Sequence, residues 1–119
     1  RVLSAGEMIT SDAFHGTGRT KLSLVQRVPL GVVVCVPPFN YPVNLAGSKI
    51  GPALASGNAS LVKPPSAGAA STLSLCAAIY AALVAEFGAD SDILPVITCI
   101  TGRGRDIGDL LTTHSLAKA

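Results

Sequence analysis

Two short turns in the sequence carry polar side chains at positions where parallel sheets hold ligands. Asn40 follows the wholly apolar run 32–36 and stands two residues before Pro42, a residue that suits the first turn of a helix. Lys63 ends a second apolar run, and Ser66 follows three residues later. Because nucleotides bind beyond the carboxyl ends of parallel strands, the two turns together predict a nucleotide-binding site.

Asn40 could supply hydrogen bonds to developing negative charge. A carboxamide at a strand end donates N–H groups to an oxyanion without adding a charge of its own. An Asn in a turn also bonds turn backbone in many proteins. The spacing around Asn40 leaves both roles open.

Lys63 and Ser66 are residue types that suit a phosphate group. After the second strand of a nucleotide-binding sheet, an acid usually holds the two ribose hydroxyls. Lys63 in that place, with Ser66 as the N-cap of the next helix, predicts a pocket for a 2′-phosphate instead. The alternative is a solvated lysine at a strand end and a simple helix cap.

The third turn, Gly102-Arg103-Gly104, is expected to let an adenine lie close to the backbone. It departs from the dinucleotide fingerprint, because Gly108 falls one residue late for that spacing. The cysteines show no metal-ligand spacing and are expected to be small buried hydrophobes, and the histidines are expected at the surface. These residues are Cys35, Cys76 and Cys99, and His15 and His114.

The composition limits the class of protein. The chain has 119 residues, is 49% hydrophobic and only 13% charged, which favours one small domain with a core over a disordered chain. Between Asp12 and Glu86 there are five basic residues and no carboxylate, which fits a phosphate-bearing ligand or an ordinary surface. Few aromatic residues and scattered basic ones argue against nucleic-acid binding. Without an 18-residue apolar run or a signal-peptide pattern, we expect no membrane association and a cytoplasmic location.

The elements that must position these turns alternate along the chain. An α/β fold is expected, half of a Rossmann-like doubly wound parallel sheet in the order β-α-β-α-β-α, preceded by part of a β-hairpin arm. Residues 1–5 resemble the last turn of a helix, with Gly6 as its cap. Pro52 is expected to kink the first long helix or end its regular part, and Gly57-Asn58 is expected to stop the helix. The other expected segments are a loop at 10–19, a β-prone stretch at 20–28, strands at 32–36, 59–63 and 94–100, and helices starting near 42, 66 and 104.

Several stretches together resemble the aldehyde dehydrogenase superfamily. The sequence Phe-Asn-Tyr-Pro-Val-Asn-Leu with Lys-Pro-Pro-Ser is most similar to its NADP-dependent, non-phosphorylating glyceraldehyde-3-phosphate dehydrogenases. The resemblance runs from about residue 20 to residue 114. The stretches are 29–34, 38–42, 49–58, 63–66 and 101–104.

The resemblance implies roles for individual residues. Asn40 would be the oxyanion-hole amide, and Tyr41 would contact the substrate near its phosphate. The catalytic Cys and the general-base Glu of the family would lie beyond Ala119. The implied NADP-binding residues are Pro37 and Phe39 near the nicotinamide, Lys63 and Ser66 at the adenosine ribose and its 2′-phosphate, and Gly104 and Asp109 beside the adenine.

The implied activity is NADP-dependent oxidation of an aldehyde to a carboxylic acid, glyceraldehyde 3-phosphate to 3-phosphoglycerate, through a Cys thiohemiacetal. Residues 1–19 would be the end of a helix and a loop, 20–31 part of an oligomerisation arm of a homo-oligomer, and 32–119 the first half of an NADP-binding domain. The alternatives are an aldehyde dehydrogenase for another small-molecule aldehyde, or a non-catalytic nucleotide-binding or structural module of the same fold.

Overall fold

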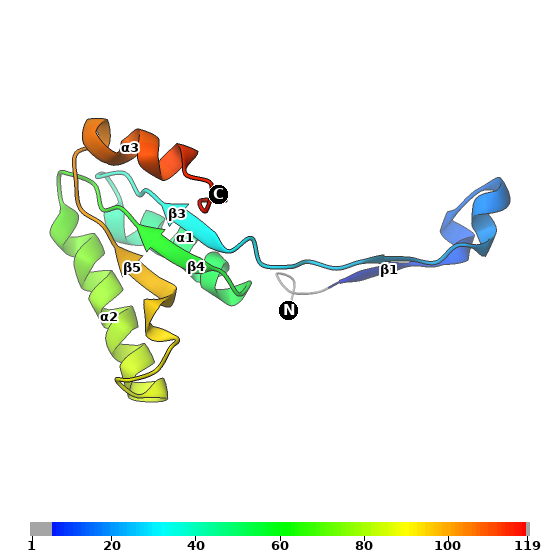
Figure 1. Ribbon diagram of the computed structural model, residues 1–119, viewed down its shortest axis with the longest axis horizontal. Coiled ribbons are helices and arrows are strands. Elements are labelled where there is room, and N and C mark those ends of the chain that lie inside the picture. The colour runs from blue at the N-terminus through cyan, green and yellow to red at the C-terminus, as the bar shows by residue number, and fades with distance from the viewer. Residues whose placement is uncertain (1–5, 119) are drawn as a thin grey trace.

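A computed structural model describes residues 6–118, without the side chains of residues 18 and 19. The helix turn expected at 1–5 lies outside the described residues. Figure 1 shows two parts: a small sheet flanked by helices, and a long two-stranded ribbon that projects from it. The whole measures 58 × 36 × 26 Å.

The sheet has three parallel strands in the order β3-β4-β5. Each strand is followed by a helix, which confirms the expected α/β class with a parallel sheet and the β-α-β-α-β-α order. The elements are β3 (Val32–Cys35), α1 (Pro42–Ala55), β4 (Ala59–Val62), α2 (Ala69–Phe87), β5 (Ile97–Cys99) and α3 (Gly104–Thr113).

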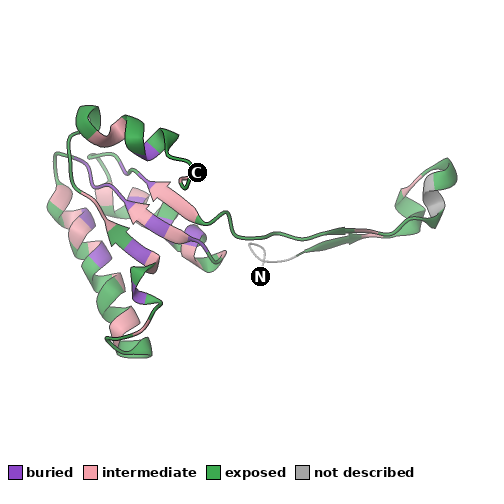
Figure 2. Ribbon diagram, viewed as in Figure 1, coloured by how far each residue is buried: buried purple, intermediate pink, exposed green. Residues whose placement is uncertain are grey.

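Helices cover both faces of this sheet. Side chains of a strand alternate between the faces, so Val33 and Cys35 pack toward α1 and α2. Val32 and Val34 line the other face, together with Leu110 of α3. Buried positions gather where the helices meet the sheet (Figure 2). The core cluster consists of Cys35, Ala46, Ile50, Val62, Cys76 and Ile97.

The first helix begins and ends largely as the sequence predicts. Pro42 occupies its first turn, where a missing N–H costs nothing. At the other end Gly57 adopts φ +83°, and the N–H groups of Gly57 and Asn58 donate to the carbonyls of Leu54 and Ala53 at 3.0 and 2.9 Å. This Schellman cap ends the helix at the expected stop, Gly57-Asn58, and the helix continues past Pro52 to Ala55.

Two other boundaries differ from expectation. Ser66 is not the N-cap of α2, because Gly68 holds that position with φ +76° and the helix begins at Ala69. The strand expected from residue 94 begins only at Ile97, since Leu94–Val96 forms a short 3-10 helix. Pro95 within that segment has no N–H to give to a strand ladder.

The ribbon contains a strand that the sequence did not predict. β1 (Glu7–Ile9) pairs antiparallel with β2 (Ser23–Val25), so residues 7–9 form a strand inside the segment expected to hold a helix end and a loop. Between the strands, the expected loop folds into two short 3-10 helices, Ser11–Ala13 and Gly16–Thr20. The pairing of β1 depends on a partner about sixteen residues away, as Met8↔Leu24 shows.

The helix α2 is long and apolar enough to cross a membrane by length and composition, although no uninterrupted apolar run in it reaches 18 residues. One such helix is weak evidence for a membrane span. In the structure it packs on α1 and β5 and buries Thr72 and Cys76. Near the other end of the described chain, Ala117 forms an isolated parallel bridge with Val32 on the edge of β3.

Candidate functional site

The turns singled out by the sequence lie along one edge of the sheet. The ladder continues past the strand ends, because Lys63 N–H donates to the Cys35 carbonyl and Ile100 N–H to the Val62 carbonyl, both at 2.9 Å. The loops after β3, β4 and β5 therefore leave the sheet side by side (Figure 1). This is the carboxyl edge, where open α/β sheets bind ligands.

Asn40 lies in the loop between β3 and α1 and is exposed. Its carboxamide bonds no other residue of the described part of the chain, so the turn-bonding role has no support there, and both N–H donors are free for a ligand. Pro37 at the start of this loop is fully buried and fixes the loop to the core. Phe39 and Tyr41 on either side are 70% and 67% exposed. The loop thus presents a neutral donor between two open aromatic rings.

Lys63 is the unusual residue of the second loop. Its side chain is only 6% exposed, and its Nζ donates to the Pro64 carbonyl at 3.2 Å. An ammonium has three N–H donors, and within residues 6–118 the structure shows no second acceptor and no carboxylate partner for this one. A buried cation needs further polar partners, so this donor set fits an anionic group.

Ser66 lies in the same loop and is exposed. Because α2 begins three residues later, its hydroxyl does not cap the helix, and the predicted helix N-terminus at Ser66 is wrong. The residue still shares a short loop with Lys63, whose two intervening prolines, Pro64 and Pro65, are buried. Lys63 and the Ser66 hydroxyl are therefore still close together in the chain. Ser66 does not lie at the helix N-terminus, however, where the helix dipole would favour an anion.

In the third loop, between β5 and α3, the backbone of Gly102 packs closely against the side chain of Ile107. A Cβ on Gly102 would lie 2.7 Å from Cδ1 of Ile107, so a larger residue in this turn into α3 would force the Ile107 side chain to move. Gly104 is the first residue of that helix and lies near the same edge. Asp109 is exposed five residues further on, about 7.5 Å along the helix axis at 1.5 Å per residue. Gly104 is thus placed at the edge, and Asp109 is set back from it.

Sequence reasoning gave Asn58 no role beyond stopping a helix, yet its side chain joins three segments. Its Oδ1 accepts hydrogen bonds from the N–H groups of Leu30 and Gly31 at 2.6 and 3.0 Å. Its Nδ2 donates to the Ala53 carbonyl at 3.2 Å and to Ser56 Oγ at 3.0 Å. The buried carboxamide links the chain entering β3 to the end of α1 and the start of β4. The only local signal was an Asn after a helix-ending Gly.

The cysteines pack in the core, as the sequence predicts for Cys35 and Cys76, while Cys99 is only partly buried. Burial raises the pKa of the Cys35 thiol, opposed by its contact with Ser60 and by the charge of Lys49. No group of three or more potential metal ligands occurs among the described residues.

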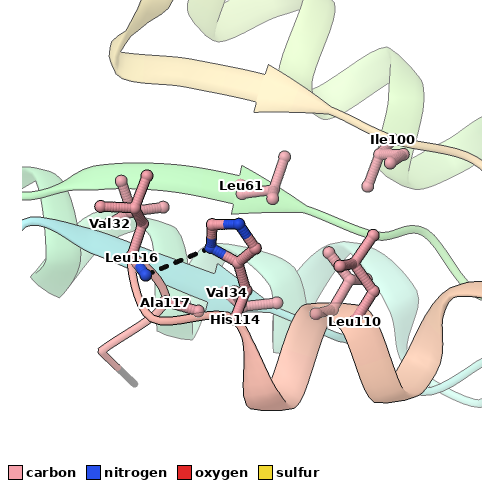
Figure 3. Close-up of a pocket in the computed structure, with 9 residues that line it drawn as sticks. Val32, Val34, Leu61, Ile100, Leu110, His114, Leu116 and Ala117 are labelled. Carbon is pink, nitrogen blue, oxygen red and sulfur yellow. Dashed lines mark hydrogen bonds between the residues drawn. The ribbon is translucent and has the colours of Figure 1, made fainter.

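A cavity of about 300 Å³ lies between the sheet and α3 (Figure 3). Its lining is almost wholly apolar and includes Val32, Leu61 and Leu116. His114, which is exposed as predicted, lines it too, and its Nδ1 accepts a hydrogen bond from Leu116 N–H at 3.2 Å. Apart from His114, the lining side chains are apolar and offer no donor to a nucleotide phosphate.

The chain is similar in sequence and in structure to several known proteins. The curated relatives include the NADP-dependent glyceraldehyde-3-phosphate dehydrogenase of Zea mays, 47% identical over 114 residues, which make up 96% of this chain and 21% of the relative. The enzyme of the same name from Streptococcus equinus is 44% identical over 109 residues, covering 92% of this chain and 21% of the relative. The chain thus spans about a fifth of the length of these relatives.

Among solved structures, the NADP-dependent glyceraldehyde-3-phosphate dehydrogenase from Bacillus halodurans C-125, complexed with NADP, superposes with a TM-score of 0.70 at 41% identity. The match covers 94% of this chain and 22% of that protein. The sequence also matches the Aldehyde dehydrogenase family over residues 2–119. The chain belongs to the aldehyde dehydrogenase family.

Proposed function

We propose that this chain forms part of the NADP-binding portion of an enzyme that oxidises an aldehyde to a carboxylic acid. The observation that carries the proposal is the carboxyl edge of the sheet, where Asn40 offers free neutral donors and Lys63 a nearly buried cation with spare ones. The names of the relatives from Zea mays, Apium graveolens and Streptococcus equinus, each an NADP-dependent glyceraldehyde-3-phosphate dehydrogenase, support the same conclusion.

The donor set of the second loop fits NADP. Lys63 would bind the adenosine ribose and its 2′-phosphate, with the Ser66 hydroxyl as a second donor. No carboxylate stands in this loop to repel the phosphate or to favour a free 2′-hydroxyl. The chemistry that NADP would supply in this site is that of a hydride acceptor for the oxidation of the aldehyde. The other proposed cofactor contacts are Pro37 and Phe39 at the nicotinamide end and Gly104 and Asp109 at the adenine end.

Asn40 would act on the carbonyl oxygen of the substrate. When a nucleophile adds to an aldehyde, that oxygen gains negative charge, and a preorganised N–H donor stabilises it. Asn40 is neutral and held by a loop whose Pro37 is buried, so it can be oriented without attracting a counter-ion. We place the nucleophile, a cysteine thiolate, in a part of the protein outside this chain.

The proposed substrate is glyceraldehyde 3-phosphate, converted to 3-phosphoglycerate. Tyr41 beside Asn40 is exposed and would contact the substrate near its phosphate. We also propose that the ribbon is an oligomerisation arm of a homo-oligomer, because Met8, Leu22 and Leu24 on it leave most of their apolar surface uncovered.

The test uses the full-length protein and a panel of aldehydes with and without a phosphate, and it measures NADPH formation by absorbance. We expect the highest kcat/KM for glyceraldehyde 3-phosphate with NADP. The Asn40→Ala variant should lower kcat by about 10²–10³, the usual cost of one oxyanion donor, with NADP affinity unchanged. The matched control is Asn44→Ala, which removes an exposed carboxamide on α1 four residues away.

Each possible outcome tests a different part of the proposal. A kcat for Asn40→Ala within a few-fold of wild type would reduce Asn40 to a turn residue. A clear preference for an unphosphorylated aldehyde would replace the substrate and keep the enzyme class. NADP binding without turnover of any aldehyde would favour a non-catalytic nucleotide-binding module.

A further inference from the structure

Two thiols from different elements line one cavity on the helix-covered side of the sheet. Cys99 is the last residue of β5, and Cys76 lies on α2, which packs against that strand. Both line a cavity of about 320 Å³ that opens to solvent along one side. The rest of the lining is formed by Leu73, Ala77, Tyr80 and Ile97.

The third cysteine, Cys35, does not line this cavity and lies far from Cys99. The strand register aligns Cys35 with Val62 and Val62 with Cys99, so Cys35 and Cys99 share a face of the sheet but are separated by a whole strand. Two strand spacings amount to roughly 9.6 Å, too far for one atom to bridge their sulfurs. Cys35 is fully buried and does not line the cavity.

The environment keeps Cys76 protonated. Burial, and next the neighbouring Cys99 thiol, raise the pKa of Cys76 to about 12. Reactions that start from a thiolate, such as disulfide exchange, are therefore slow at this residue near neutral pH. A reagent suited to this pair must bond both sulfurs and leave no net charge in an apolar cavity.

We propose that Cys76 and Cys99 form a dithiol site for organic trivalent arsenicals. In the reaction, an arsenic–oxygen group R–As=O condenses with the two thiols to give R–As(SR′)₂ and water. Two arsenic–sulfur bonds form, both thiol protons leave with the oxygen as water, and no atom changes its oxidation state. The product is neutral, as an apolar cavity requires.

The size of the cavity fits an aryl substituent on the arsenic. An apolar cavity of about 150 Å³ suffices to hold benzene, and this cavity is larger at about 320 Å³. Leu73, Tyr80 and Ile97 give the ring apolar and aromatic contacts. A small aryl arsenical should therefore bind better than inorganic arsenite.

The experiment treats the native full-length protein with phenylarsine oxide near equimolar ratio, and then maps the adduct by mass spectrometry. Trypsin releases residues 50–103 as one peptide, because Lys63 is followed by a proline, and Cys35 falls in a separate peptide, 28–49. We expect the 50–103 peptide to gain one phenylarsenic group and lose two hydrogens. Cleavage after Glu86 should then leave pieces 50–86 and 87–103 joined until a competing dithiol is added.

Single-thiol variants supply the controls. Cys76→Ser and Cys99→Ser should each abolish the cross-link and lower adduct yield at least tenfold, whereas Cys35→Ser should leave both unchanged. Melting curves of the variants verify that each remains folded. A native wild-type protein with no cross-linked adduct would overturn the proposal, as would equal yield in either single-thiol variant or preferential labelling of peptide 28–49.

Discussion

Replacing Asn58 should destabilise the junction between the ribbon and the sheet. The carboxamide is only 5% exposed and makes four hydrogen bonds. Two of them hold the N–H groups of Leu30 and Gly31 just before β3. The other two hold the end of α1 through Ala53 and Ser56.

The expected cost follows from these bonds. Each neutral hydrogen bond contributes about 1 kcal/mol net, which sets an upper value of about 4 kcal/mol for Asn58→Ala. Leu30 and Gly31 are themselves exposed, so water can reach their freed N–H groups and recover part of the loss. We expect the free energy of unfolding to fall by about 2–3 kcal/mol.

Asn58→Asp is the informative partner variant. It keeps an oxygen acceptor for Leu30 and Gly31 but buries a charge and turns a carboxylate oxygen toward the Ala53 carbonyl, so we expect a loss at least as large as for Asn58→Ala. Asn44→Ala, at an exposed position on α1, should stay within about 0.5 kcal/mol of wild type.

The assay is equilibrium unfolding in urea of the full-length variants, combined with amide hydrogen exchange. Exchange at Leu30 and Gly31 should accelerate in Asn58→Ala and remain slow in the Asn44→Ala control. The reasoning is refuted if the free energy of unfolding of Asn58→Ala lies within about 0.5 kcal/mol of wild type and exchange at those two amides is unchanged. The hydrogen bonds of the Asn58 side chain would then contribute nothing to stability.

Two further predictions concern the cofactor and pH. Ser66→Glu should weaken NADP binding by roughly tenfold, about 1.4 kcal/mol, because a carboxylate would face the 2′-phosphate at an exposed, partly screened position, while NAD binding changes little. Titration of both cofactors checks it, with Ser74→Glu on α2 as the control, and an unchanged NADP-to-NAD affinity ratio would remove Ser66 from the phosphate site. Because the pKa of Cys76 rises from 9.0 to about 12 on folding, the unfolded chain loses this proton first, so the free energy of unfolding should fall as pH rises from about 9 to 12. Urea unfolding across this range should show a shallower decline for Cys76→Ala, and parallel declines would contradict the assignment.

The sequence alone predicted those strand and helix boundaries that depend on residues close by in the chain. The apolar runs that form β3 and β4 are each followed by two prolines, which have no N–H to donate to a strand ladder. The positions of the loops carrying Asn40 and Lys63 therefore follow from the sequence alone. Pro42 likewise marks the first turn of α1 through its own chemistry.

Prediction failed where a distant or competing partner decides the outcome. Ser66 is a favourable N-cap by type, but Gly68 can adopt a positive φ and takes that position. Asn58 gains its role from Leu30 and Gly31, 28 and 27 residues away, which no local pattern reveals. The strand Glu7–Ile9 forms only because β2 lies beside it.

The bridge between Ala117 and Val32 has a consequence for where a ligand can enter. It brings the chain back to the side of β3 opposite β4, and Lys118 N–H donates to the Val32 carbonyl at 3.0 Å there. A parallel strand continuing from this bridge would make β3 a topological switch point, because the connections on its two sides would then run in opposite directions. Because ligands of open α/β sheets bind beyond the carboxyl end at such a point, we expect an incoming molecule to bind beside the loop that holds Asn40.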